Sequence, residues 1–164
     1  MVRRRLAAVG LALGLLAVPA RGWAQDTPVR QIGAGLSLLD DEDQRAPGPV
    51  VDFSQRLAKA GPVAIEGVGE FGLNKFLDVA AYSYVGGVRG AYALGRTRLF
   101  GQFLLGVERA IGETDLATQP GFGVDVRITR RFSIRGQIDI RTVQIEVGHF
   151  TENRYLAGVV FNLK

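Results

Sequence analysis

The sequence has no cysteine, and it has only one histidine and one tryptophan among its 164 residues. The lack of cysteine excludes disulfide bonds, thiolate zinc sites and cysteine nucleophiles. Long hydrophobic runs are also missing, because the apolar stretch over residues 6–18 falls short of the roughly 18 residues that a membrane-spanning helix needs. Metal-ligating residues are absent as a set, so we expect no metal and no cofactor.

The first residues have the composition of a secretory signal. Arginines at residues 3–5 precede the apolar stretch, and Gly22 and Ala24 are small residues at the positions that signal peptidase requires for cleavage after Ala24. We therefore expect residues 1–24 to be a removable signal peptide. Residues 25–164 are then the exported part, and their length fits one domain.

The charge balance of the exported part argues against nucleic acid as a partner. Four of the twenty basic residues lie in the leader, and the remaining sixteen equal the sixteen acidic residues in number. Nucleic-acid binding depends on a surplus of basic side chains that neutralise phosphates. We therefore expect no nucleic-acid partner.

After the leader, apolar and polar residues alternate with the period of two that is typical of β-strands. The clearest segment is FGVDVRITRRFSIRGQIDIR, residues 122–141, which predicts two strands joined by a turn at residues 129–131. The same alternation recurs in residues 30–38, 50–57, 63–71, 82–92, 98–108 and 154–163. The sequence therefore predicts eight strands.

The connections between these strands are expected to alternate in length. Long ones are predicted at residues 39–49, 73–81, 110–119 and 142–153, and short ones at residues 58–62, 94–97 and 129–131. Strands of about nine to eleven residues suffice to cross a bilayer when tilted. The pattern predicts an all-β fold, an eight-stranded antiparallel up-and-down transmembrane β-barrel of the outer membrane, with tight turns and both chain ends in the periplasm.

Alternation alone leaves two orientations of the strand faces open. If the apolar faces point outward to lipid, the interior of an eight-stranded barrel is just wide enough to be filled by side chains, and a charge network plugs it. If they point inward, the chain is a soluble periplasmic or secreted lipocalin-like calyx that binds a hydrophobic ligand. The first orientation places these charges inside: Asp52, Arg56, Glu66, Glu70, Arg89, Arg98, Glu108, Asp125, Arg127, Arg135, Asp139, Arg141 and Arg154.

Aromatic residues near the expected strand ends favour the membrane orientation, because aromatic girdles are typical of both membrane interfaces. Near the long connections these residues are Phe71, Tyr82, Tyr84, Phe122 and Tyr155, and near the short turns they are Tyr92, Phe132 and Phe161.

The segment over residues 122–141 and the ending YLAGVVFNLK resemble the small bacterial outer-membrane β-barrel domain family of OmpX-like, opacity-like and OmpA transmembrane-domain barrels. The resemblance implies residence in the cell outer membrane, with membrane lipid and the barrel-assembly machinery as partners and an extracellular ligand for the long loops. It also implies a structural or surface-interaction role. One departure is the ending Asn162-Leu163-Lys164, because such proteins usually finish on an aromatic residue.

Two features of the sequence bear on whether the protein is an enzyme or has a binding site: a group of residues around His149 and an acidic run. His149 and Thr151, with Glu146 or Glu152, imitate the histidine, hydroxyl and carboxylate of lipid A deacylases, but Thr151-Glu152 stands where that resemblance calls for serine followed by asparagine. A catalytic triad depends on positioned geometry, so we expect no catalysis, and a lipid A-modifying enzyme is the minor alternative. The acidic run at residues 40–43 is expected to be a solvated loop tip.

Overall fold

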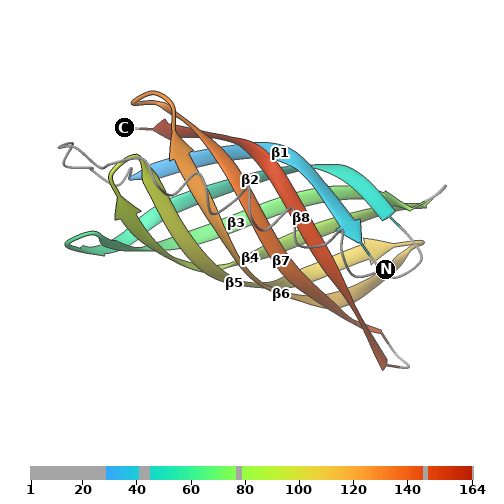
Figure 1. The fold of residues 1–164 in the computed structure, drawn as a ribbon. Helices are drawn as coiled ribbons and strands as arrows, with labels where there is room; N and C mark the ends of the chain where they lie inside the picture. The colour runs from blue at the N-terminus through green and yellow to red at the C-terminus, as the bar shows by residue number, and fades with distance from the viewer. Residues whose placement is uncertain (1–28, 41–44, 77–78, 146–147, 164) are drawn as a thin grey trace, which may run out of the picture.

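The computed structural model describes residues 29–40, 45–76, 79–145 and 148–163, and these form eight antiparallel strands that close into a barrel (Figure 1). Within this part of the chain, no helix is long and apolar enough to cross a membrane. The strands are β1 (Arg30–Asp40), β2 (Arg45–Ala60), β3 (Val63–Phe76), β4 (Val79–Leu94), β5 (Thr97–Ala110), β6 (Glu113–Arg127), β7 (Phe132–Ile145) and β8 (Gly148–Leu163).

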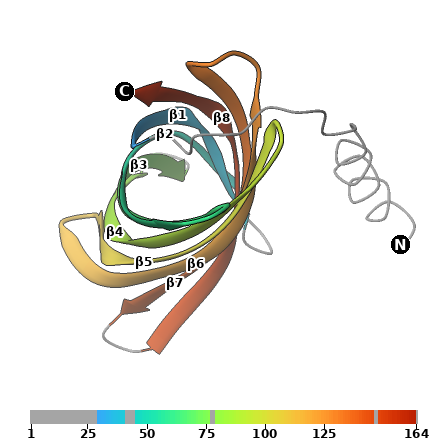
Figure 2. The same cartoon turned by 90° about the vertical axis from the view of Figure 1, so that its left-hand side faces the viewer.

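Every strand pairs with its sequence neighbours, and β1 also pairs with β8, which closes the sheet. Arg30 lies opposite Leu163 at this seam, so β1 begins and β8 finishes at the same end, which we call the terminal end. The path of paired residues that starts at Arg30 and crosses β2 to β8 returns to β1 at Asp40 instead of at Arg30. The sheet therefore closes with an offset along the strands. This offset tilts the strands relative to the barrel axis, as Figure 2 shows.

Tight turns join the strands at the terminal end. Gly61 and Gly95 each open a two-residue turn with φ of 58° and 57°, which glycine adopts without steric cost. The β5–β6 turn at the opposite end consists of Ile111 and Gly112, with φ of 51° and 85°. Positive φ at both central residues is the geometry of a type I′ hairpin turn, which matches the twist of the flanking strands.

The predicted long connections are wrong. The strands continue into all four of them, so residues 110–119 contain a two-residue turn, and residues 73–81 and 142–153 are strand except for residues 77–78 and 146–147, which lie outside the described residues. Residues 41–44 of the first connection also lie outside them. The physical reason is that the alternation of apolar and polar residues becomes irregular in these segments, whereas the backbone pairing continues, for example between Ala110 and Glu113 and between Ile145 and Gly148. The strands are accordingly 11 to 16 residues long instead of nine to eleven.

The apolar strand faces point outward and the polar faces point inward. This arrangement excludes the soluble calyx, whose apolar residues would line the interior. Exposed apolar residues include Ile32, Leu36, Val51, Phe53, Ile65, Phe71, Tyr84, Val88, Phe103, Leu105, Phe122, Ile134, Ile138 and Ile140. Two aromatic contacts stand on this outer surface: Phe71 packs on Tyr84 with ring centroids 5.0 Å apart, and Phe132 meets Phe161 edge-on at 5.3 Å beside the terminal end.

Candidate functional site in the barrel interior

Interior glycines make room for the charged side chains. A Cβ atom on Gly33 would lie 1.9 Å from an Asp52 carboxylate oxygen, and one on Gly121 would lie 1.8 Å from Asp139 Oδ1. In both cases the carboxylate belongs to the residue directly across the strand pair. The absence of a side chain on the glycine therefore lets each carboxylate fold over the neighbouring strand and reach the arginines of the interior.

Arg98 and Arg135 organise the half of the interior nearer the terminal end. Arg98 donates to Glu66, to Asp125 at 2.7 Å and to the Gln31 side-chain oxygen at 2.8 Å. Arg135 bonds Asp125 through two nitrogens at 2.7 and 3.1 Å and holds both oxygens of Asp52 at 2.9 and 3.0 Å. Contacts in which a guanidinium group binds a carboxylate through two nitrogens are among the strongest hydrogen bonds in proteins.

Phe100 interrupts the polar face of β5 and takes part in the same cluster. The guanidinium carbons of Arg89 and Arg135 lie 4.5 and 4.9 Å from the centre of its ring. Both distances suit cation–π attraction, which gains strength in a buried setting. Gly123 makes space for this ring, because a Cβ there would lie 2.4 Å from Phe100 Cζ.

A second cluster fills the other half of the interior around Arg141 and Arg154. Arg154 donates to Glu70, and Gln119 donates to the same carboxylate at 3.1 Å. Arg141 pairs with Glu108 at 2.8 Å and bonds the Gln119 side-chain oxygen at 2.9 and 3.1 Å. The cluster therefore joins polar and charged side chains from five different strands.

Gln102 and Asp139 connect the two clusters. Arg89 donates to the Gln102 oxygen at 2.8 and 3.0 Å, and the Gln102 amide donates to Asp139 Oδ1 at 3.2 Å. Asp139 in turn lies 3.6 Å from Arg154. The contacts thus run without a break from Gln31 to Glu108, and we call this set the interior network. An apolar cluster of Val68, Val85, Leu104, Ala117 and Val143 packs within the same interior.

The structure places the thirteen sequence-predicted interior charges as follows. Arg56 and Arg127 are half-buried at the terminal end. The other eleven have buried side chains: Asp52, Glu66, Glu70, Arg89, Arg98, Glu108, Asp125, Arg135, Asp139, Arg141 and Arg154. The sequence does not single out the neutral members of the interior network, which include Gln31, Gln102, Gln119 and Ser83, whose hydroxyl accepts from Arg141 at 3.2 Å.

Glu152 was predicted in a loop and instead belongs to β8, where its side chain is 3% exposed and lies opposite Arg141 in the register. With Glu152, seven buried carboxylates face five buried and two half-buried arginines. The signal was available, since Glu152 lies two residues before Arg154 and therefore on the same strand face.

The deacylase-like residues are not brought together. His149 and Thr151 are exposed on β8, and the Glu152 side chain points to the opposite face. Thr151 contacts the Thr142 hydroxyl at 3.1 Å, and Glu146 lies outside the described residues. In the acidic run, Asp40 belongs to β1 and pairs with Arg45 at 3.1 Å, and residues 41–43 are again outside the described part. The described residues contain no group of three potential metal ligands.

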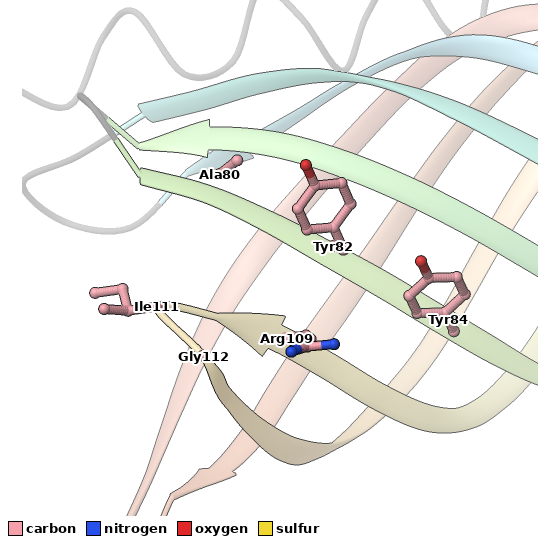
Figure 3. A pocket seen from close by; sticks show the side chains of 6 residues that line it. All are labelled: Ala80, Tyr82, Tyr84, Arg109, Ile111 and Gly112. Atoms are coloured by element: carbon pink, nitrogen blue, oxygen red, sulfur yellow. The ribbon is translucent and has the colours of Figure 1, made fainter.

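A hollow of about 370 Å³ lies on the outer surface beside the β5–β6 turn (Figure 3). Two tyrosine rings stand along β4, and an arginine stands on the neighbouring strand β5. The lining residues are Ala80, Tyr82, Tyr84, Arg109, Ile111 and Gly112. This hollow faces away from the interior network and is separate from it.

Comparison with known proteins identifies the fold. No family model and no curated protein sequence matches the chain. The crystal structure of Neisserial surface protein A (NspA) is similar with a TM-score of 0.66 at 12% sequence identity, over 82% of this chain and 96% of that chain. The crystal structure of Ail, the attachment invasion locus protein of Yersinia pestis, is similar with a TM-score of 0.53 at 12% identity, over 80% and 95% of the two chains.

The closed sheet with an apolar outside and a charged inside defines the class, an eight-stranded transmembrane β-barrel of the outer-membrane type. The likeness to NspA and Ail agrees with this class. The resemblance read from residues 122–141 and from the last strand is thereby confirmed for the fold.

Proposed function

We propose that this protein is a small outer-membrane barrel with a structural or surface-interaction role, without catalytic activity, and with a lumen closed by the interior network. The observation that carries the proposal is the unbroken series of contacts from Gln31 to Glu108 across the interior. The lumen of an eight-stranded barrel is only wide enough for side chains, so a filled lumen leaves no path for ions.

The outer surface supports residence in lipid. Apolar side chains cover every strand pair at mid-height, and such a band is what the hydrocarbon core of a bilayer solvates. We further propose that residues 1–24 direct export and that the barrel-assembly machinery inserts the chain.

We also propose that the extracellular end of the barrel binds a ligand. Ail of Yersinia pestis has been solved in complex with the heparin analogue sucrose octasulfate. In the present chain, a surface ligand would meet the strand ends around the β1–β2, β3–β4, β5–β6 and β7–β8 connections. Because these strands extend into the predicted loops, the described part of this surface consists of strand ends together with the β5–β6 turn.

Planar-bilayer recording tests the closed lumen. We expect folded protein to insert without a large steady conductance, because moving ions would have to displace paired charges. Insertion is verified on the same sample by the mobility shift between unboiled and boiled gel electrophoresis. A large steady conductance from folded protein contradicts the closed lumen, and a monomer that stays soluble without detergent contradicts the membrane barrel.

A further inference from the structure

The two ends of the barrel differ strongly in exposed charge. Five exposed basic residues surround the terminal end: Arg30, Lys59, Arg96, Arg130 and Arg131. We call this set the basic rim. Among the described residues, every carboxylate that is not buried lies at the opposite end, namely Asp40, Glu113 and Asp115. The terminal end therefore presents a positive surface with no exposed carboxylate in the described part of the chain.

The basic rim extends around the barrel instead of forming one patch. Arg30 begins β1 and Lys59 lies one residue before the end of β2, whereas Arg96 lies in the β4–β5 turn and Arg130 and Arg131 lie in the β6–β7 turn. Backbone hydrogen bonds fix two of these turns: Arg127 N donates to Arg96 O at 2.8 Å, and Asn162 N donates to Arg131 O at 2.9 Å. The positions of the rim charges are thus set by the barrel itself.

The height of the basic rim matches the headgroup layer of a membrane. Arg131 directly precedes Phe132, which packs against Phe161 on the outer surface. Arg96 closely follows the exposed Tyr92 and Leu94. Interfacial aromatic residues mark the boundary between hydrocarbon and headgroups, so the cations immediately beyond them lie among the phosphates.

We propose that the basic rim binds the anionic headgroups of phospholipids in the leaflet that surrounds the terminal end. The inference rests on the membrane residence proposed above. A ring of separate cations fits several phosphodiester headgroups around the circumference better than it fits one compact ligand. Each basic side chain near an anionic membrane surface adds attraction that salt screens.

The test measures the folding of the protein from urea into vesicles of dioleoyl phosphatidylcholine. The vesicles are prepared with and without dioleoyl phosphatidylglycerol at about one lipid in five. We expect phosphatidylglycerol to raise the folding equilibrium constant by about fivefold for each rim cation that meets a headgroup, and high salt to remove the gain. The triple variant Arg96→Gln, Arg130→Gln and Arg131→Gln should fold into phosphatidylcholine like the wild type and lose most of the gain.

The matched control removes three exposed cations from the opposite end, through Arg45→Gln, Lys75→Gln and Arg109→Gln. This variant should keep the phosphatidylglycerol effect of the wild type. The inference is overturned if the rim variant keeps the effect, or if both triple variants lose it equally. Failure of the wild type to fold into either vesicle overturns the proposed membrane residence instead, so the two failures are distinguishable.

Discussion

Arg135 shows most clearly how single residues hold this barrel together. Its guanidinium contacts Asp52, Asp125 and the ring of Phe100. Arg135→Met keeps much of the side-chain volume but leaves two buried carboxylates short of a partner, which should destabilise the barrel by about 3–5 kcal/mol. Urea unfolding in detergent micelles measures this cost.

Arg96→Gln is the control for that measurement, because Arg96 is exposed in a turn, and its loss should change stability by no more than about 0.5 kcal/mol. Equal stability of the two variants would show that the interior network contributes little. At this scale the period of two assigns each strand residue to a face, but it assigned no face to Glu152 and Gln119, because both lie in segments that were predicted as loops. It could not predict which arginine meets which carboxylate, because partners such as Arg135 and Asp52 lie on strands that only the closed register brings together.

The strands are the elements whose outer faces meet lipid, and Ile138 lies near the middle of β7 on that face. Ile138→Arg should cost about 2–4 kcal/mol, because a cation at mid-depth loses its hydration. Leu116→Arg, on the same outer face but close to the β5–β6 turn, should cost about 0–1 kcal/mol near the interface. Folding equilibria of both variants in vesicles give the comparison, and equal costs would contradict a bilayer around these strands.

Strand boundaries were the weakest prediction at this scale. The predicted connection over residues 110–119 carries Glu113 and Asp115 and lacks the alternation of a strand, so it was expected to be a loop. Backbone pairing continues there because Glu108 pairs with Asp115 and Ala110 with Glu113. The hydropathy pattern follows the part of each strand that faces lipid, whereas the length of the strand follows from its backbone hydrogen bonds. The strands therefore extend beyond the segments in which apolar and polar residues alternate.

For the whole molecule, the pairing of Arg30 with Leu163 places the two strand ends side by side. A circular permutant that joins them by a short linker and opens the chain between Gly95 and Arg96 should therefore form the same barrel. Unboiled and boiled gel mobility in detergent checks this outcome. Opening the chain inside β4, between Gly86 and Gly87, should prevent folding, and a barrel from that second permutant would contradict the view that each strand must be continuous.

The seam between β1 and β8 also determines when the interior loses water. These two strands stand at opposite ends of the described sequence, and they pair along the full length of β1. Until they meet, the sheet is open and its guanidinium and carboxylate groups remain hydrated. If the strands that are neighbours in sequence pair before this seam closes, the interior loses water only when partners already lie opposite each other, and no lone charge is buried on the way to the native barrel.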